Sequence, residues 1–256
     1  MLKRYRIQFP PAHEHDLGQD EAYFHLVEGD QQITLRFHDY DQIFKRPGLY
    51  EQLFYDRLKC TSQKKVCALL DQSLRAELMT CSELRVLDLG AGNGMMAGEL
   101  RNLGVSRIVG ADIIEEARVA AYRDRPNVYD DYTIADFTKL SPEEEADFAE
   151  WNFDCLTSVA ALGFGDIPAE AFLQAIRLIS PNGWVAFNIK ETFLDRSDLS
   201  GFSVFIRELI VSEYLDIHHL QLYTHRLSME GVPLKYFAFI GRVVKQVPED
   251  FLRALP

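Results

Sequence analysis

A glycine-rich turn in the first half of the chain is its most distinctive candidate binding element. The apolar run Val86–Leu89 leads directly into residues 90–94, which read GAGNG. Glycine has no Cβ, so its backbone can approach a bound molecule closely. Ligands of open parallel sheets bind beyond the carboxyl ends of the strands. The pattern therefore predicts a small-molecule site at this turn.

The spacing of the glycines separates two classes of nucleotide-binding protein. The nicotinamide fingerprint GxGxxG needs its third glycine at position 95, which is Met95. The pattern DxGxGxG, which begins at Asp88, instead resembles motif I of the class I S-adenosylmethionine-dependent methyltransferases. In that resemblance the turn lies along the amino-acid part and the ribose of the cofactor, with contacts from Leu89, Gly90, Ala91 and Gly92. Asp88 either positions the cofactor's ammonium group, directly or through water, or ties the loop amides.

Two further acidic residues follow the next two predicted strands. Asp112 lies about 20 residues past the glycines, where an acidic residue can accept hydrogen bonds from both ribose hydroxyls, and the adjacent Ile113 belongs to the same predicted site. The alternative for Asp112 is an N-cap of the following helix, and one residue can serve both roles. In the resemblance, Asp136 accepts from the adenine amino group and Phe137 packs near the ring. The alternative for Asp136 is a capping role before Ser141.

The end of the fourth predicted strand is expected to form the opposite wall of the site. In the resemblance residues 157–163 lie beside the transferred methyl group, and Ser158 is a predicted cofactor contact. Small side chains there leave room for an acceptor or serve close packing alone. The implied cofactor is S-adenosylmethionine, and its product is S-adenosylhomocysteine.

His225 is the best candidate for a general base, because histidine titrates near neutrality. Methyl transfer is an in-line displacement at a sulfonium carbon, and it needs a base only if the acceptor atom carries a proton. Arg226, next to His225, and residues 190–192 are also candidates to border the acceptor pocket. The alternatives are a hydrogen bond of His225 across the terminal strand pair and an ordinary salt bridge for Glu191.

Charge and missing motifs bear on the acceptor class. The chain has 27 basic and 39 acidic side chains, a formal net charge of −12, which disfavours phosphate backbones and anionic membranes. Residues 158–162 lack the Asp/Asn-Pro-Pro-aromatic motif of amino-methylating nucleic-acid enzymes, and Cys155 lacks the preceding proline of cytosine C5 enzymes. A small-molecule acceptor is therefore predicted. A protein methyltransferase and a non-catalytic S-adenosylmethionine-binding protein are the alternatives, and the oligomeric state stays open.

Metal, disulfide and membrane features are not expected. No aspartate cluster suits a divalent metal, and His13 and His15 are predicted to lie in a surface loop. The four cysteines form no CxxC pair and no evident disulfide framework. Residues 1–10 lack the apolar region of a secretory signal, and no apolar run approaches the ~20 residues that cross a bilayer. These features predict free thiols and a cytoplasmic location.

The elements that must position these residues alternate regularly from residue 84 onward. The predicted strands are 84–89, 107–111, 132–135, 153–159 and 184–189. The predicted helices are 93–103, 115–123, 169–179 and 199–215. A capping box at 141–144 begins one further helix. This alternation predicts a parallel sheet covered on both faces. Long strands at 217–227 and 234–244 follow, and their short link forces an antiparallel pair.

The first sixty residues follow a different pattern. Residues 22–27 and 33–37 flank a turn-like segment and predict a hairpin, while residues 39–58 look helical with a break at Pro47. Tyr40, Tyr50 and Tyr55 are candidates to touch the ligand or to form a core stripe. Ser62 is predicted to cap the helix that follows.

Together these patterns predict an α/β protein. The expected fold is a Rossmann-like class I methyltransferase fold: a seven-stranded, mostly parallel sheet with helices on both faces, an antiparallel last strand, and an N-terminal hairpin and helical extension. Residues 1–60 are the predicted extension and candidate lid, and residues 61–256 the predicted methyltransferase domain.

Overall fold

A seven-stranded sheet forms the centre of the molecule. The structure, a computed structural model, describes residues 3–11, 19, 21–195 and 197–255. The sheet has the order β6-β5-β4-β7-β8-β10-β9. Its strands are β4 Arg85–Leu89, β5 Arg107–Asp112, β6 Asp131–Ile134, β7 Cys155–Ser158, β8 Trp184–Lys190, β9 Leu215–Leu227 and β10 Pro233–Val243. Strands β4 to β8 pair in parallel, whereas β10 is antiparallel to both β8 and β9.

The strand order reverses next to β4. From β4 the chain builds outward through β5 to β6, and it then returns to place β7 and β8 on the other side of β4. Connections that leave in opposite directions open a crevice at the carboxyl ends of the strands at this point. The glycine-rich turn follows β4 and therefore lies at the crevice.

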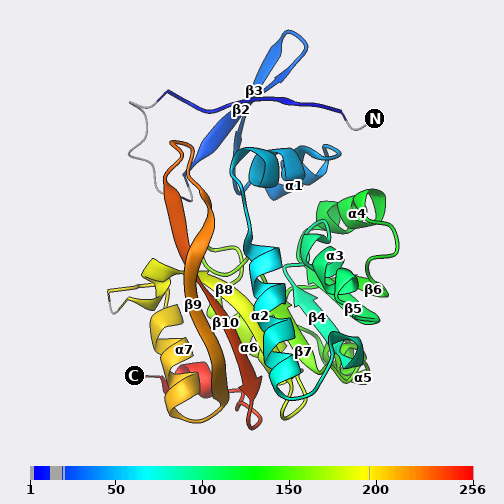
Figure 1. Ribbon diagram of the computed structural model, residues 1–256, viewed down its shortest axis with the longest axis vertical. Coiled ribbons are helices and arrows are strands. Elements are labelled where there is room, and N and C mark those ends of the chain that lie inside the picture. The colour runs from blue at the N-terminus through cyan, green and yellow to red at the C-terminus, as the bar shows by residue number, and fades with distance from the viewer. Residues whose placement is uncertain (1–2, 12–18, 20, 196, 256) are drawn as a thin grey trace.

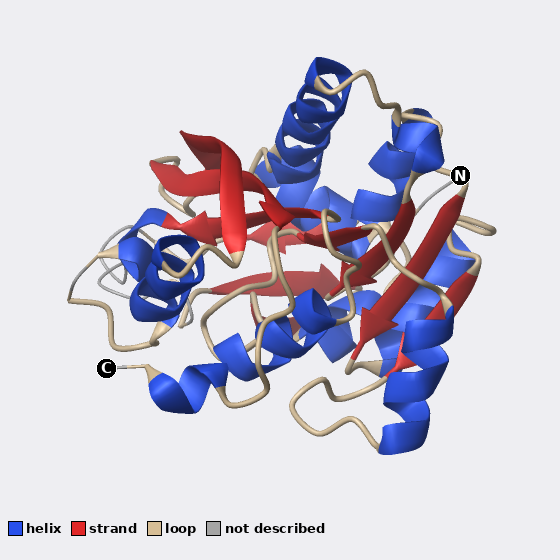
Figure 2. Cartoon of the chain, turned by 90° about the horizontal axis from the view of Figure 1, so that it is seen from below, coloured by secondary structure: helices blue, strands red, loops and turns tan. Residues whose placement is uncertain are grey.

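Helices cover both faces of the sheet (Figure 2). One layer consists of α2 Ser62–Ala76, α3 Met95–Asn102 and α4 Glu115–Asp124, and the other of α5 Pro142–Glu150, α6 Ala169–Arg177 and α7 Phe202–Val211. Strand side chains alternate between the two layers, so Val86 packs with α2 and α3, whereas Leu87 and Leu89 pack with α6. Apolar residues on both faces explain why the strands read as continuous apolar runs.

The N-terminal segment forms a smaller antiparallel sheet with its own core. Its strands are β1 Arg6–Gln8, β2 Tyr23–Glu28 and β3 Gln31–Arg36, and they are followed by α1 Tyr40–Phe44 and the π-helical η2 Glu51–Arg57. Figure 1 shows this segment at one end of the molecule, beyond the tips of β9 and β10. Leu58 O accepts from Leu227 N at 2.7 Å, and Thr61 N donates to His225 O at 3.0 Å. These bonds attach the end of the segment to β9.

The predicted architecture is confirmed, including the mostly parallel sheet, the antiparallel last strand and the N-terminal hairpin. The capping box at Ser141 is also present, with proline at the first turn of α5. Residues 39–58 form two short helical elements separated by a turn that contains Pro47, as the predicted break indicated. One local prediction is wrong. Thr61, not Ser62, occupies the N-cap position of α2, and the Ser62 hydroxyl lies 2.6 Å from His225 Nδ1.

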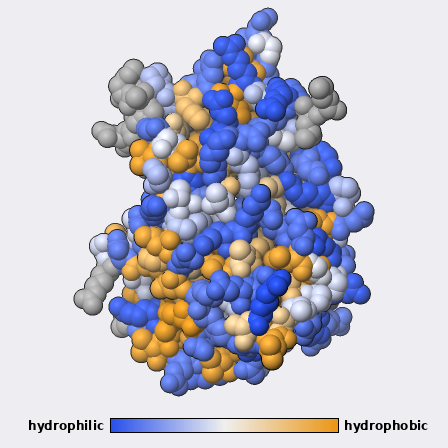
Figure 3. Space-filling model, in the orientation of Figure 1, coloured by the Kyte–Doolittle hydropathy of each residue, from blue (hydrophilic) through white to orange (hydrophobic). Residues whose placement is uncertain are grey.

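Part of the surface is apolar, and the four cysteines are free thiols. Apolar side chains gather over the lower part of the face in Figure 3, and Leu220 and Leu222 of the edge strand β9 are 49% and 46% exposed. Cys60, Cys67, Cys81 and Cys155 are all free thiols. Within the described ranges, none of the helices is both long enough and apolar enough to pass through a bilayer.

Candidate functional site

A cavity of about 450 Å³ opens at the carboxyl ends of β4, β5 and β6. Most of the predicted cofactor residues line it: Leu89, Gly90, Ala91, Gly92, Asp112, Ile113, Asp136 and Phe137. Asp88, Ser158 and His225 do not line it. Its volume is typical of pockets that bind small molecules and cofactors, about 300–1,000 Å³.

The glycine turn folds back against the next strand. Gly90 N and Ala91 N both donate to Ala111 O, at 2.8 and 3.1 Å. Gly90 has φ +71°, and a Cβ there would lie 2.7 Å from the Ala161 Cβ and 2.8 Å from the Ile167 Cδ1. Both the left-handed backbone and the close approach require glycine. The bare backbone of the turn thus forms one wall of the cavity.

Asp112 joins this turn to the start of α4. Its Oδ2 accepts from Gly92 N at 2.8 Å, and its Oδ1 accepts from Ile114 N at 3.1 Å. Burial raises the pKa of Asp112, and the backbone hydrogen bonds oppose that shift. Each carboxylate oxygen has a second lone pair, so the residue can support the loop and still accept from a ligand in the cavity.

Asp88 lies beneath the turn, away from the cavity. Its side chain accepts from Thr157 Oγ1 at 2.7 Å and from Tyr129 Oη at 2.8 Å. Burial raises its pKa to about 6, although both hydrogen bonds favour the charged form. Asp88 therefore links β4 to β7 and to Tyr129, and its predicted contact with an ammonium group stays a prediction.

Asp136 and Phe137 form the far end of the cavity. Asp136 Oδ1 accepts from Thr138 N at 3.0 Å and from Thr138 Oγ1 at 2.6 Å, and its Oδ2 lies 3.1 Å from Lys139 Nζ. These contacts lower the pKa of Asp136 to about 2, so the carboxylate is charged at neutral pH. Phe137 is buried and packs against Phe148, with the ring centroids 5.0 Å apart. An acceptor of hydrogen bonds thus stands beside an apolar wall.

The end of β7 contributes backbone rather than the predicted serine side chain. Ser158 is fully buried, and its Oγ has no hydrogen-bond partner among the described residues. The following residues, Val159, Ala160 and Ala161, line the cavity. Ala160 has φ +61°, and its N–H donates to Asn188 Oδ1 at 2.6 Å. This bond holds the loop after β7 in a strained backbone conformation at the cavity wall.

A second, smaller cavity of about 30 Å³ adjoins the first. The two cavities share lining residues from the N-terminal segment and from the loop after β7: Tyr40, Tyr50, Ala160, Ala161 and Asp166. His225 and Arg226, at the end of β9, line only the smaller cavity. The predicted base and its neighbour therefore lie next to the large cavity rather than in it.

His225 belongs to a chain of polar side chains. Its Nδ1 lies 2.6 Å from Ser62 Oγ, and Ser62 Oγ lies 2.6 Å from Tyr223 Oη. Asn188 Nδ2 donates to both oxygens, at 3.2 and 2.8 Å. Burial, assisted by the charge of Arg226, lowers the pKa of His225 well below 6.5. The ring is therefore neutral near pH 7 but a weaker base than an exposed imidazole, so, contrary to the expectation from the sequence, it does not titrate near neutrality.

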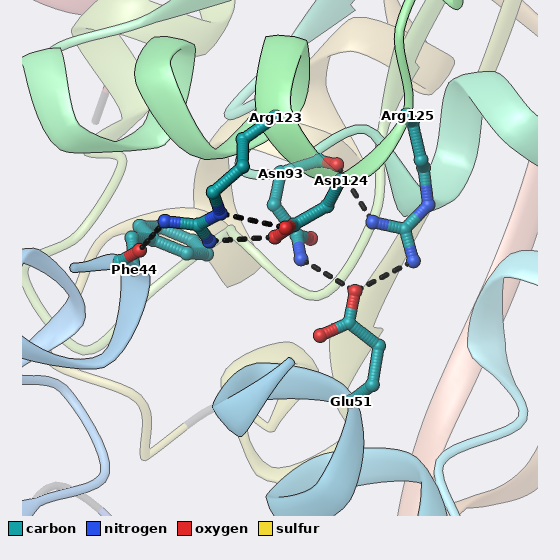
Figure 4. A network of polar contacts seen from close by, with 6 residues as sticks. All are labelled: Phe44, Glu51, Asn93, Arg123, Asp124 and Arg125. Atoms are coloured by element: carbon teal, nitrogen blue, oxygen red, sulfur yellow. Dashed lines mark hydrogen bonds and ion pairs between the residues drawn. The ribbon is translucent and has the colours of Figure 1, made fainter. Parts of the chain in front are cut away.

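The N-terminal segment covers the large cavity. Tyr40, Phe44 and Tyr50 line it, whereas Tyr55 lines neither cavity. Glu51 anchors the segment to the main domain, because its Oε1 accepts from Asn93 Nδ2 at 2.8 Å and from Arg125 Nη2 at 2.7 Å (Figure 4). Tyr40 and Tyr50 therefore reach the cavity, and they also pack against other aromatic rings. Tyr55 packs against Tyr50 and does not reach the cavity.

Comparison with known proteins agrees with this geometry. Residues 87–187 match the family model described as a methyltransferase domain. A solved structure of the N-methyltransferase NodS from Bradyrhizobium japonicum superposes with a TM-score of 0.55 at 14% identity, covering 82% of this chain and 98% of that one. A Thermoplasma acidophilum structure gives 0.52 at 16% identity, covering 78% and 97%. At 14% and 16% identity, these two matches show that the chain shares the fold of those proteins.

Residues 87–187 therefore resemble a methyltransferase domain.

Curated relatives resemble a part of this chain. The ubiquinone biosynthesis O-methyltransferase of Thiobacillus denitrificans is 31% identical over 104 residues, which are 41% of this chain and 43% of that protein. The mitochondrial enzyme of the same name from Candida albicans is 30% identical over 123 residues, 45% of this chain and 35% of that protein. The chain thus spans less than half the length of the curated relatives it matches.

Several residues around the two cavities could not be predicted from the sequence. Asp166 lines both cavities and pairs with His38, whose Nδ1 lies 2.9 Å from Asp166 Oδ2. Asn188 holds the loop after β7, and a polar residue inside the apolar run of β8 was a signal for such a role. Gln63 lines the large cavity from the first turn of α2.

Other candidates do not line either cavity or lie outside the described residues. Residues 190–192 line neither cavity. His13 and His15, for which a surface loop was predicted, lie outside the described residues. In the described part of the chain, no group of three or more histidine, cysteine, aspartate or glutamate side chains is arranged to hold a metal.

Proposed function

We propose that this protein binds S-adenosylmethionine in the large cavity and transfers its methyl group to a small-molecule acceptor, leaving S-adenosylhomocysteine. One observation carries the proposal. A glycine turn and two acidic residues follow three neighbouring parallel strands, and all of them line one cavity of about 450 Å³. This is the crevice in which open α/β sheets bind ligands.

The residues present fit a sulfonium nucleoside. The bare turn from Gly90 to Gly92 allows close approach, and Asp112 beside it has lone pairs for the ribose hydroxyls. Asp136 is charged and can accept from the adenine amino group, while Phe137 and Ile113 give the ring apolar neighbours. When bound, S-adenosylmethionine supplies an activated methyl group.

The smaller cavity is the proposed site of the acceptor. It lies between the N-terminal segment and the loop after β7, and it shares five lining residues with the large cavity. Cover from the N-terminal segment favours a small molecule over a folded protein or a nucleic acid. The curated relatives named above are O-methyltransferases, and we extend to this chain an acceptor oxygen that carries a proton.

His225 is the proposed general base for that proton. The new bond forms between the acceptor oxygen and the methyl carbon, the carbon–sulfur bond breaks, and the acceptor proton passes to the neutral imidazole. In the tautomer in which Nδ1–H donates to Ser62 Oγ, the other ring nitrogen, Nε2, has the free lone pair that would receive the proton. Positioned bases contribute roughly 10²–10⁴-fold to rate. The remaining acceleration comes from orientation in the enclosed site.

Transfer of a labelled methyl group tests the proposal. The protein is incubated with methyl-labelled S-adenosylmethionine and a cell extract that has been divided by ultrafiltration into small molecules and macromolecules. Label in the small-molecule fraction is expected. At a cofactor concentration below its dissociation constant, Asp112→Ala should lower this labelling by about 10- to 100-fold, whereas the surface variant Glu115→Ala should not. Label only in macromolecules would contradict the small-molecule acceptor. Binding of the cofactor without transfer to either fraction would support a non-catalytic binding protein.

A further inference from the structure

Arg226 is a buried cation that forms no ion pair with a carboxylate of the described residues. Its residue is 4% exposed, at the end of β9. Its Nη1 donates to Leu227 O at 3.0 Å, and its guanidinium lies over the rings of Phe37 and Phe54, 5.3 and 6.0 Å from their centroids. No ion pair joins Arg226 to any acidic side chain in the described ranges.

Other arginines that are shielded from water behave differently. Arg125 pairs with Glu51, Arg177 with Glu249 and Arg242 with Glu77. Transfer of a charge out of water is costly, so buried charges are normally paired or bind a ligand. Burial lowers the pKa of Arg226, but a guanidinium stays protonated in proteins. Arg226 is therefore a permanent charge without a counter-ion among the described residues.

The side chain does face a cavity. Arg226 lines the smaller cavity together with aromatic side chains from the N-terminal segment. The lining residues in the described part of the chain include one carboxylate, Asp166, and it pairs with His38 instead. Tyr236 Oη accepts from Gln19 Nε2 at 2.8 Å, and its own proton has no acceptor among the described residues. The Arg226 guanidinium and the Tyr236 hydroxyl are thus two hydrogen-bond donors, and they favour a ligand that accepts hydrogen bonds.

We propose that Arg226 binds a carboxylate group of the methyl acceptor, while the acceptor oxygen of the same molecule lies between His225 and the lining that the two cavities share. A guanidinium presents a planar pair of donors that matches a carboxylate. A cavity of about 30 Å³ suits this small planar group better than a phosphate. Aromatic walls from Phe37, Tyr40 and Tyr50 suit an apolar body on the acceptor.

The assignment rests on the proposed function, since it names the acceptor class of that same site. S-adenosylmethionine also carries a carboxylate, in its amino-acid part. Arg226 lines only the smaller cavity, whereas the glycine turn lines the large one, and this separation favours the acceptor as the source. Binding of S-adenosylhomocysteine, which retains the amino-acid carboxylate, distinguishes the two sources.

The first test needs no knowledge of the acceptor. The thermal midpoint of the full-length protein is measured with formate, acetate and benzoate and with the matching uncharged amides. At probe concentrations tenfold above the dissociation constant, a carboxylate should raise Tm by about 4 °C. The amides should not, and neither should the carboxylates raise the Tm of Arg226→Met. Arg242→Met is the matched control, because it removes a paired arginine and should keep the response.

Equal responses of the wild type and Arg226→Met to carboxylates, or no carboxylate response in the wild type, would overturn the proposal. Arg226→Lys keeps the positive charge, so carboxylates should still raise its Tm, but by less than in the wild type. This variant controls for a folding defect caused by loss of the charge in Arg226→Met. In parallel, S-adenosylhomocysteine should bind wild type and Arg226→Met within about threefold of each other. A tenfold or greater loss would assign the carboxylate to the cofactor and overturn the acceptor assignment. No binding to the wild type would instead contradict the proposed function, independently of the anion test.

A third readout uses the labelled product. In the methyl-transfer reaction with the small-molecule extract, the labelled product should be retained on an anion exchanger at pH 8 and released by salt. A product that flows through the resin would contradict a carboxylate-bearing acceptor. Arg226→Met should lose most of the transfer while still binding S-adenosylhomocysteine.

Discussion

Asp112 Oδ2 accepts a hydrogen bond from the backbone N–H of Gly92 at 2.8 Å. This contact joins the end of β5 to the turn after β4, at the wall of the large cavity. A residue that only capped α4 would not need to reach back to the glycine turn. The contact explains how one carboxylate can set the shape of the loop and present its free lone pairs to a ligand.

Replacement of Asp112 by alanine should weaken binding of S-adenosylhomocysteine by about 10- to 100-fold. The variant leaves Gly92 N and Ile114 N without their acceptor and removes the proposed partner of the ribose, a loss of about 1–3 kcal/mol. Calorimetric titration measures the affinity. Glu115→Ala, in the first turn of α4, is the control and should bind like the wild type. An unchanged affinity in Asp112→Ala would refute the ribose assignment.

The free energy of unfolding of Asp88→Asn, measured relative to that of the wild type, should increase as pH rises. Burial raises the pKa of Asp88 from 3.8 to about 6, so the folded protein holds this proton more tightly than the unfolded chain does. Its contribution to stability is therefore fully present below pH 3.8 and is lost as pH rises through 6. Between pH 5 and pH 8 the advantage of the variant should grow by about 1 kcal/mol.

Urea unfolding at several pH values measures this difference, because the asparagine can keep hydrogen bonds to Tyr129 and Thr157. A difference that stays constant with pH would show that Asp88 is not a buried, perturbed carboxylate. The prediction that Asp88 positions an ammonium group requires in addition that the same variant bind S-adenosylhomocysteine at least tenfold more weakly.

His225→Gln should lower kcat by about 10²–10⁴-fold and leave the affinity for S-adenosylhomocysteine within about threefold. The reason is that His225 lies outside the cofactor cavity and faces the smaller one. Ser62→Ala should lower kcat less, because it removes the partner of Nδ1 and leaves the imidazole in place. Initial rates with the labelled cofactor measure both effects. A His225→Gln variant with the kcat of the wild type would exclude this residue as the base.

Glu51→Gln should speed the release of S-adenosylhomocysteine by about tenfold. Glu51 pairs with Arg125 and Asn93 and so attaches η2 to the main domain above the large cavity, and a charge-assisted bond of this kind is worth about 1–3 kcal/mol. Stopped-flow chase of bound ligand measures the rate. Asp41→Asn in α1 is the control, since Asp41 pairs with Lys45 at the surface. Equal release rates in Glu51→Gln and the wild type would argue against the N-terminal segment as a lid.

Local patterns in the sequence were sufficient to predict most of the fold. The buried strands appear as apolar runs, and the link of a few residues between β9 and β10 permits only an antiparallel pair. The positions of Asp112 and Asp136 follow from the same logic, because the ends of parallel strands meet at one edge of the sheet.

Tertiary contacts explain what the sequence could not predict. Ser62 has the local signature of a helix cap, but its hydroxyl lies against His225, which is 163 residues away in the chain. The position of Arg226 against Phe37 and Phe54 also depends on tertiary contacts, because these two rings come from the other end of the chain. Asp88 shows the same limit, since its burial depends on Tyr129 and Thr157.

The central claim is that the large cavity binds a sulfonium nucleoside and its product. Calorimetric titration of the wild-type protein with S-adenosylhomocysteine, S-adenosylmethionine and NAD tests it most directly. We predict saturable one-to-one binding of the first two ligands and no heat of binding from NAD. Binding of NAD in preference to S-adenosylhomocysteine, or of neither, would contradict the account.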